Sequence, residues 1–86
     1  MYLSTARIGP LKGLADISPD RLIEVLWRNP ASGARIEHLR VRAGPQSLDI
    51  AIFTSAGTQA ESDEVARRLI VATLNAQPEL NLWRLL

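Results

Sequence analysis

Cysteine is absent from this sequence of 86 residues, and histidine occurs only once, as His38. The absence of cysteine excludes disulfide bonds, iron–sulfur clusters, thiolate metal sites and a cysteine nucleophile. A lone histidine with no second histidine or cysteine is a poor ligand set for a metal ion. We therefore expect neither a metal site nor a cofactor.

Long hydrophobic runs and an excess of one charge are also missing. The longest apolar run, Leu69–Ala72, is far shorter than the roughly 20 residues that cross a bilayer, and the first residues do not resemble a signal peptide. Ten basic and nine acidic residues give a formal net charge of +1, which disfavours a general binder of nucleic acids or membrane surfaces. The sequence thus predicts a cytoplasmic protein that does not contact membranes.

Size and composition predict one globular domain over residues 1–86. The apolar fraction of 47 % and the charged fraction of 22 % are typical of a folded chain. A chain this short buries only about 60–65 % of its extended surface, so a partner chain is a common source of further stability. All basic residues except Lys12 are arginine, a bias that favours a bacterial source with a GC-rich genome.

Local signals predict two helices. Ser18 followed by Pro19 is typical of a helix start, and Pro30 closes that helix. Thr58 and Glu61 have the spacing of a capping box, and Pro78 stops the helix that follows at about residue 76. The buried stripes are predicted to be Leu22, Val25 and Leu26 in the first helix, and Val65, Leu69, Ala72 and Ala76 in the second, with Ile70 and Leu74 beside them.

Alternation of apolar and polar residues predicts the strands. Residues 35–43 and 47–54 alternate on either side of the turn Gly44-Pro45-Gln46, which indicates a β-hairpin. Further strands are expected over residues 2–8, ended by Gly9-Pro10, and over residues 80–86. Residues 11–17 are expected to form a loop or an extra helical turn.

The register of this hairpin follows from the rule that core residues face core residues across a strand pair. Val41 is placed opposite Ile50, and Leu39 opposite Ile52. The same register pairs Arg42 with Asp49, Arg40 with Ala51, and His38 with Phe53 on the other face of the sheet. Ile36 is expected on that other face as well, because it is two residues from His38.

The predicted order of elements is βαββαβ, which resembles the ferredoxin-like arrangement over the whole chain. The resemblance lies in the fold pattern and not in a sequence motif. It implies an α+β fold with a four-stranded antiparallel sheet of strand order 4-1-3-2. Right-handed crossovers place both helices on one face of that sheet and leave the opposite face open.

Candidate chemistry is sparse. His38 is the only candidate general base near neutral pH, and stacking on Phe53 is its alternative role. Arg40 and Arg42, together with Arg7 and Arg84, offer bidentate donors for a small anionic ligand, or simply form a solvated surface. Residues 54–58 lead into a helix start, as phosphate loops do, but the acidic residues of the first helical turn would repel an anion.

This sequence has only a weak similarity to the functional families that share the ferredoxin-like fold. The loop after the first strand lacks the cysteine pair of metallochaperones and the arginine-bearing anion loop of acylphosphatases. Residues 13–17 are similar to the turn of ACT regulatory domains, although the helix begins later here. A single-stranded RNA platform requires aromatic side chains on both central strands, and only Phe53 is well placed.

We therefore predict a non-catalytic protein-interaction or regulatory module that acts as a homodimer or an adaptor. The alternatives are a small dimeric α/β-barrel enzyme with His38 as its acid or base, and an ACT-like domain that senses a ligand. Trp27 and Trp83 are expected in the core or at its rim, or else on a partner surface. The candidate interface residues are Ile36, His38, Arg40, Arg42, Phe53 and Trp83, and the homodimer contact is expected at the open sheet face or at an edge strand.

Overall fold

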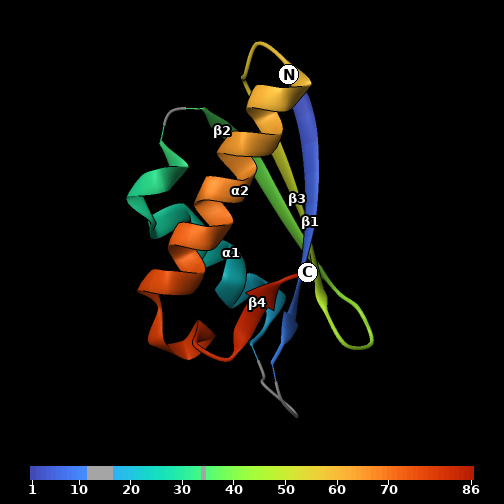
Figure 1. The fold of residues 1–86 in the computed structure, drawn as a ribbon, viewed down its shortest axis with the longest axis vertical. Coiled ribbons are helices and arrows are strands. Elements are labelled where there is room, and N and C mark those ends of the chain that lie inside the picture. Colours follow the sequence, from blue (N-terminus) through green and yellow to red (C-terminus); the bar gives the residue numbers. More distant parts are fainter. Residues whose placement is uncertain (12–16, 34) are drawn as a thin grey trace.

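The computed structural model describes residues 1–11, 17–33 and 35–86 and has an α+β fold, with a four-stranded antiparallel sheet and two helices (Figure 1). The strands and helices are β1 (Tyr2–Pro10), α1 (Pro19–Arg28), β2 (Ile36–Ala43), β3 (Leu48–Thr54), α2 (Gln59–Ala76) and β4 (Trp83–Leu85), with short 3-10 turns η1 (Pro30–Ser32) and η2 (Pro78–Leu80). The loop expected at residues 11–17 falls mainly on residues 12–16, which lie outside the described residues.

The sheet has the order β2-β3-β1-β4, so β3 and β1 are its central strands. Both helices lie on the same side of the sheet (Figure 1). Along β3, buried side chains alternate with half-buried ones, as expected where one face packs on the helices and the other does not. Among the residues that the structure describes, none forms a layer over this second face.

The predicted hairpin register is confirmed. Val41 lies opposite Ile50 and Leu39 opposite Ile52, with both isoleucines and Leu39 buried in the core. On the other face, the three predicted pairs are Arg42 with Asp49, Arg40 with Ala51, and His38 with Phe53. The Gly44 N–H donates to the Ser47 carbonyl at 2.8 Å and closes the turn.

The predicted position of Ile36 on the open face is wrong. A β-bulge interrupts the ladder between Ile36, which lies opposite Thr54, and His38, which lies opposite Phe53. The extra residue, Glu37, breaks the alternation of side chains, so Ile36 turns into the core and is only 6 % exposed.

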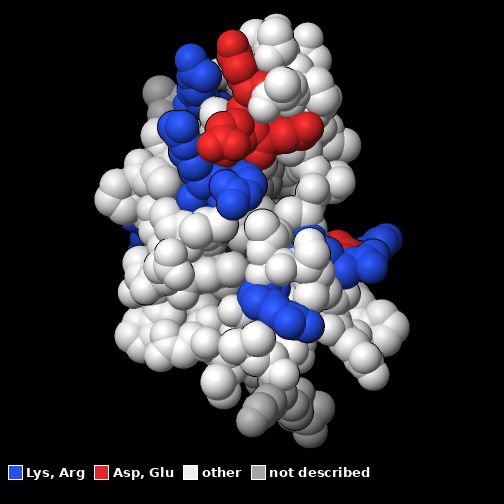
Figure 2. Space-filling view, in the orientation of Figure 1, with Lys and Arg blue, Asp and Glu red and all other residues white. Residues whose placement is uncertain are grey.

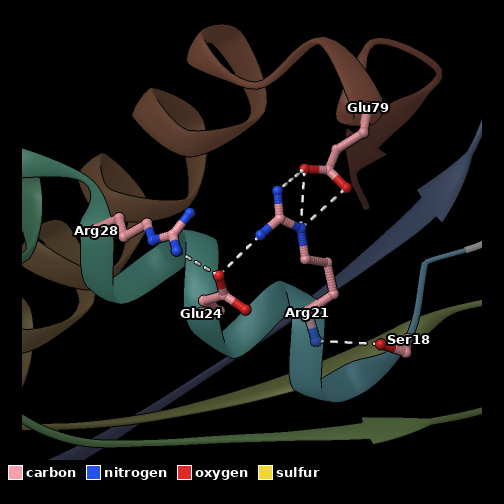
Figure 3. A network of polar contacts seen from close by, with 5 residues as sticks. All are labelled: Ser18, Arg21, Glu24, Arg28 and Glu79. Carbon is pink, nitrogen blue, oxygen red and sulfur yellow. Dashed lines mark hydrogen bonds and ion pairs between the residues drawn. The ribbon is translucent and has the colours of Figure 1, made fainter.

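Helix α1 begins and ends where the sequence predicts. The Ser18 side chain accepts a hydrogen bond from the Arg21 N–H at 3.1 Å, and Asn29 caps the C-terminal end. The Arg21 guanidinium contacts Glu24 at 2.9 Å and Glu79 of η2 at 2.8 Å, so it links the two segments (Figure 3). Its hydrogen bonds with Glu79 raise the pKa of Arg21 above the usual arginine value.

The predicted buried stripe of α2 is rotated from the observed one. The buried residues of this helix are Ser62, Ala66, Leu69, Ile70 and Thr73. By contrast, Ala76 is exposed, and Val65 and Leu74 are only partly buried. Leu69 and Ile70 are buried as predicted, but the rest of the predicted stripe is wrong because it contained only apolar residues, whereas the hydroxyl side chains of Ser62 and Thr73 occupy the buried face.

The final strand is shorter than predicted. Residues 78–80 form the turn η2, and β4 pairs only with residues Ile8, Gly9 and Pro10 of β1. Consequently β1 continues through Gly9-Pro10 instead of ending before it. Trp83 lies in the core and is 8 % exposed, in agreement with the first of its two predicted locations.

Ile50 lies at the centre of the core and is 1 % exposed. We expect Ile50→Ala to lower the free energy of unfolding by about 2–5 kcal/mol, because the truncated side chain leaves a cavity between the sheet and the helices. Leu82, which is 55 % exposed, provides the control: Leu82→Ala should have little effect. Equal denaturation midpoints for the two variants would contradict this description of the core.

Candidate interaction site

The sheet face turned away from the helices is the candidate site, and we call it the arginine face. Strand registers place its side chains, because residues opposite each other in antiparallel strands point to the same side. They are Leu3, Thr5 and Arg7 from β1, His38, Arg40 and Arg42 from β2, Asp49, Ala51 and Phe53 from β3, Arg84 from β4, and Leu86 beyond it.

The centre of the arginine face is hollowed. An open cavity of about 820 Å³ lies over the middle of β2, β3 and β1, and its walls include Arg7, Arg40 and Arg42. The small side chains Thr5 and Ala51 form its floor, which leaves space between the longer arginines. The twist that strands impose on a sheet favours such a concavity.

His38 and Phe53 form an aromatic pair beside this cavity. Their ring centroids are 5.7 Å apart and their planes are inclined by 47°. The Arg40 Nε–H donates to His38 Nε2 at 3.3 Å, so this imidazole nitrogen acts as an acceptor. Within the described residues no carboxylate contacts His38, so a histidine base would lack the orienting partner that such catalysis uses.

Asp49 is the only acidic residue in the ladder of the arginine face, and two arginines share it. Arg7 contacts its carboxylate at 2.8 Å and Arg42 at 3.8 Å. Four arginines and one aspartate give the face a formal charge of +3, whereas the whole chain carries +1. The remaining residues therefore carry −2. Glu37, which bulges out of the ladder at the end of β2, would change the two values to +2 and −1.

The helical side has a different charge pattern. Figure 2 shows acidic side chains gathered near the beginning of α2 and basic side chains beside them, while another charged group projects beyond the sheet at the right-hand edge. Glu61, Asp63 and Glu64 occupy the first turns of α2. Their position complements the positive end of the helix dipole, as the sequence predicts, and opposes anion binding there.

Of the six candidate interface residues, the structure brings four together. His38, Arg40, Arg42 and Phe53 lie on the arginine face, and the other two lie in the core, as described above. Thr5 and Leu86 also line the cavity but were not among the candidates. The alternation of β1 could have identified Thr5, because it shares a face with Arg7.

A second polar cluster was missed by the sequence analysis and lies between α2 and the sheet. The Thr54 hydroxyl donates to Ser62 Oγ at 2.9 Å, Ser62 and Ser4 are 2.7 Å apart, and Ser4 donates to Asp63 at 2.7 Å. Since each hydroxyl has one proton, Ser62 must donate to Ser4. These bonds, with those from Gln59, hold the pKa of Asp63 below its usual range.

This cluster is a structural feature rather than a nucleophile site. Ser62 and Thr54 are fully buried, and no histidine reaches either hydroxyl among the described residues. Each hydroxyl of this cluster donates to an acceptor within it, which allows polar residues on the buried face of α2.

Comparisons with known proteins add no assignment. No protein-family model matches the chain, and no curated protein or solved structure was found that matches it. Across residues 1–11, 17–33 and 35–86, no group of three histidine or acidic side chains is placed to hold a metal ion. In the same part of the chain, neither helix has the length and apolarity needed to cross a membrane.

The buried hydroxyl chain predicts a specific sensitivity at Ser62. We expect Ser62→Ala to lower the free energy of unfolding by about 1–3 kcal/mol, because the buried Thr54 hydroxyl loses its acceptor. Ser55→Ala is the matched control, since the Ser55 side chain is exposed and makes only a long contact of 3.5 Å. Urea denaturation measures both, and an unchanged midpoint for Ser62→Ala would show that this chain does not contribute to stability.

Proposed function

We propose that the chain is a non-catalytic protein-interaction module with a ferredoxin-like fold, and that the arginine face is its binding surface. The sheet order β2-β3-β1-β4 and the position of both helices on one side support the fold assignment. Fold alone does not specify function, because this arrangement serves many activities. The functional proposal therefore depends on the surface itself.

The observation that carries the proposal is the hollow at the centre of the arginine face. Ala51 is only half-buried on its floor, between the arginines that line the cavity, and the half-buried Phe53 lies beside the hollow against His38. This mixture is too apolar for an ordinary solvated surface, and arginine and aromatic residues are both enriched at protein interfaces. A partner polypeptide that covers the hollow would bury the apolar floor and engage the arginines at its rim.

The enzyme alternative receives less support. A small dimeric α/β-barrel enzyme would enclose its substrate in a largely apolar pocket, whereas arginine side chains line this cavity on two strands. His38 is exposed and contacts Arg40 rather than a carboxylate. The ACT-like alternative concerns residues 13–17, of which 13–16 are outside the described part of the chain.

Site-specific crosslinking tests the binding surface. We expect a photo-crosslinking phenylalanine derivative at position 51 to form adducts of discrete mass in cells, because this position lies at the centre of the hollow. The same group at position 68, an exposed position of α2, is the control and should give no discrete adduct. Adducts at position 68 but not at position 51 would contradict the proposal.

The homodimer predicted from the sequence is a separate part of the proposal. Like charges oppose a contact between two arginine faces. We therefore expect the dimer contact at the edge of β1 that faces β4, because β4 pairs only with residues 8–10 of that edge. Light scattering should give a dimer mass at micromolar concentration, and Phe53→Glu should leave that mass unchanged. A monomer mass would remove the homodimer, and dissociation by Phe53→Glu would place the contact on the arginine face instead.

A further inference from the structure

The arginines of this protein fall into two groups according to their partners. Away from the arginine face, Arg21 and Arg28 pair with Glu24, Arg35 pairs with Glu61, and Arg68 pairs with Glu64. Most arginines elsewhere therefore have a glutamate partner within the chain. The arginines of the open sheet face are differently placed.

The charge of the arginine face is incompletely neutralised. Its single ladder carboxylate, Asp49, is bound closely by Arg7, and the longer contact to Arg42 leaves that side chain 86 % exposed. Arg40 donates through Nε to the imidazole of His38 and not to a carboxylate, so its two terminal nitrogens are not used in this contact. Neither Arg40 nor Arg84 has an acidic partner among the described residues.

The spacing of these groups suits an extended acidic segment. Arg40 and Arg42 are two residues apart on β2, and side chains at that separation on a strand are about 6.5–7 Å apart. Carboxylates on alternate residues of an extended peptide have the same separation. Ala51 in the hollow, opposite Arg40, and Phe53 beside the hollow offer apolar contact area for a side chain of such a peptide.

From these observations we infer that the arginine face binds an acidic, partly apolar segment of a partner protein. The segment's carboxylates pair with Arg7, Arg40 and Arg42, and an apolar side chain fills the hollow over Ala51. Guanidinium groups bind carboxylates in a bidentate manner, which gives such a contact direction as well as attraction. This inference rests on the proposed function and specifies the chemistry of the partner.

Two other occupants fit less well. A second copy would set a face of formal charge +3 against an identical one, and like charges in contact are unfavourable. A single-stranded nucleic acid matches the charge but needs aromatic platforms for its bases. The central strand β1 presents Leu3, Thr5 and Arg7 on this face, and Phe53 is inclined against His38.

The test uses a defined probe: an N-acetylated peptide of about eight residues, long enough to reach across the sheet, with glutamates on both sides of one leucine. Titration into the isotope-labelled protein, followed by amide chemical shifts, should perturb β2 and β3 around Arg40 and Ala51. The matched peptide with glutamine in place of every glutamate should bind much more weakly. Raising the salt concentration from about 0.05 M to about 0.5 M should weaken binding, because exposed charge pairs are screened.

A pair of double variants provides the control. Arg40→Gln with Arg42→Gln should weaken binding of the acidic peptide about tenfold, since two exposed charge pairs are lost. Arg67→Gln with Arg68→Gln removes the same charge from α2 and should leave the affinity unchanged. If both double variants weakened binding equally, net charge alone would explain the interaction, and the inference would be overturned.

Further outcomes separate this inference from the proposed function. Equal affinity for the glutamine peptide, perturbations confined to α2, or tighter binding of an oligothymidine of similar length would each overturn the acidic partner. Competition by free glutamate at the same carboxylate concentration would indicate a small-anion site instead. If position 51 still forms discrete adducts in any of these cases, the interaction surface stands and only the partner chemistry fails. If it forms none, both fail.

Discussion

The alternation of side chains along β3 is the constraint on which the rest of this structure depends. This central strand pairs with β1 on one side and β2 on the other. Its even-numbered residues Leu48, Ile50 and Ile52 are buried under the helices, while Asp49, Ala51 and Phe53 face outward. Because a shift of one residue would exchange these faces, the same pairing fixes both the core and the arginine face. Core and candidate site are therefore two consequences of one register.

Polar side chains are arranged differently on the two sides of this sheet. On the covered side, Thr54, Ser62 and Ser4 form a hydrogen-bonded chain that ends at Asp63 and leaves no hydroxyl donor unsatisfied. On the open side, the carboxylate of Asp49 contacts two guanidinium groups, and Arg40 and Arg84 have no acidic partner among the described residues. A saturated network stabilises the contact between α2 and the sheet, whereas an unsaturated one leaves binding capacity for another molecule.

Charge distribution gives a more informative description of this protein than its net charge. The value of +1 suggests a weak overall field, yet the basic residues of the open face and the acidic residues at the start of α2 lie on different sides of the sheet (Figure 1). A local charge of this kind acts over about 10 Å at moderate salt, which is comparable with the width of the face. Selection of a partner by charge is therefore compatible with a nearly neutral chain.

The sequence by itself determined the features that depend on neighbouring residues. Local chemistry was sufficient for three features: the helix start at Ser18, the capping of α2 by Thr58 and the hairpin register. Each of them depends on residues that are near one another in the sequence. Tertiary structure decided the bulge at Glu37, which sends Ile36 into the core, and the hydroxyls of Ser62 and Thr73, which occupy the buried face of α2. It also decided that Trp83 is buried. The bulge, the hydrogen bonds of Ser62 and the burial of Trp83 depend on residues far away in the chain. The Thr73 hydroxyl donates to the Leu69 carbonyl of its own helix, but only the packing of α2 on the sheet decides that it is buried. The polarity of a single residue does not indicate these contacts.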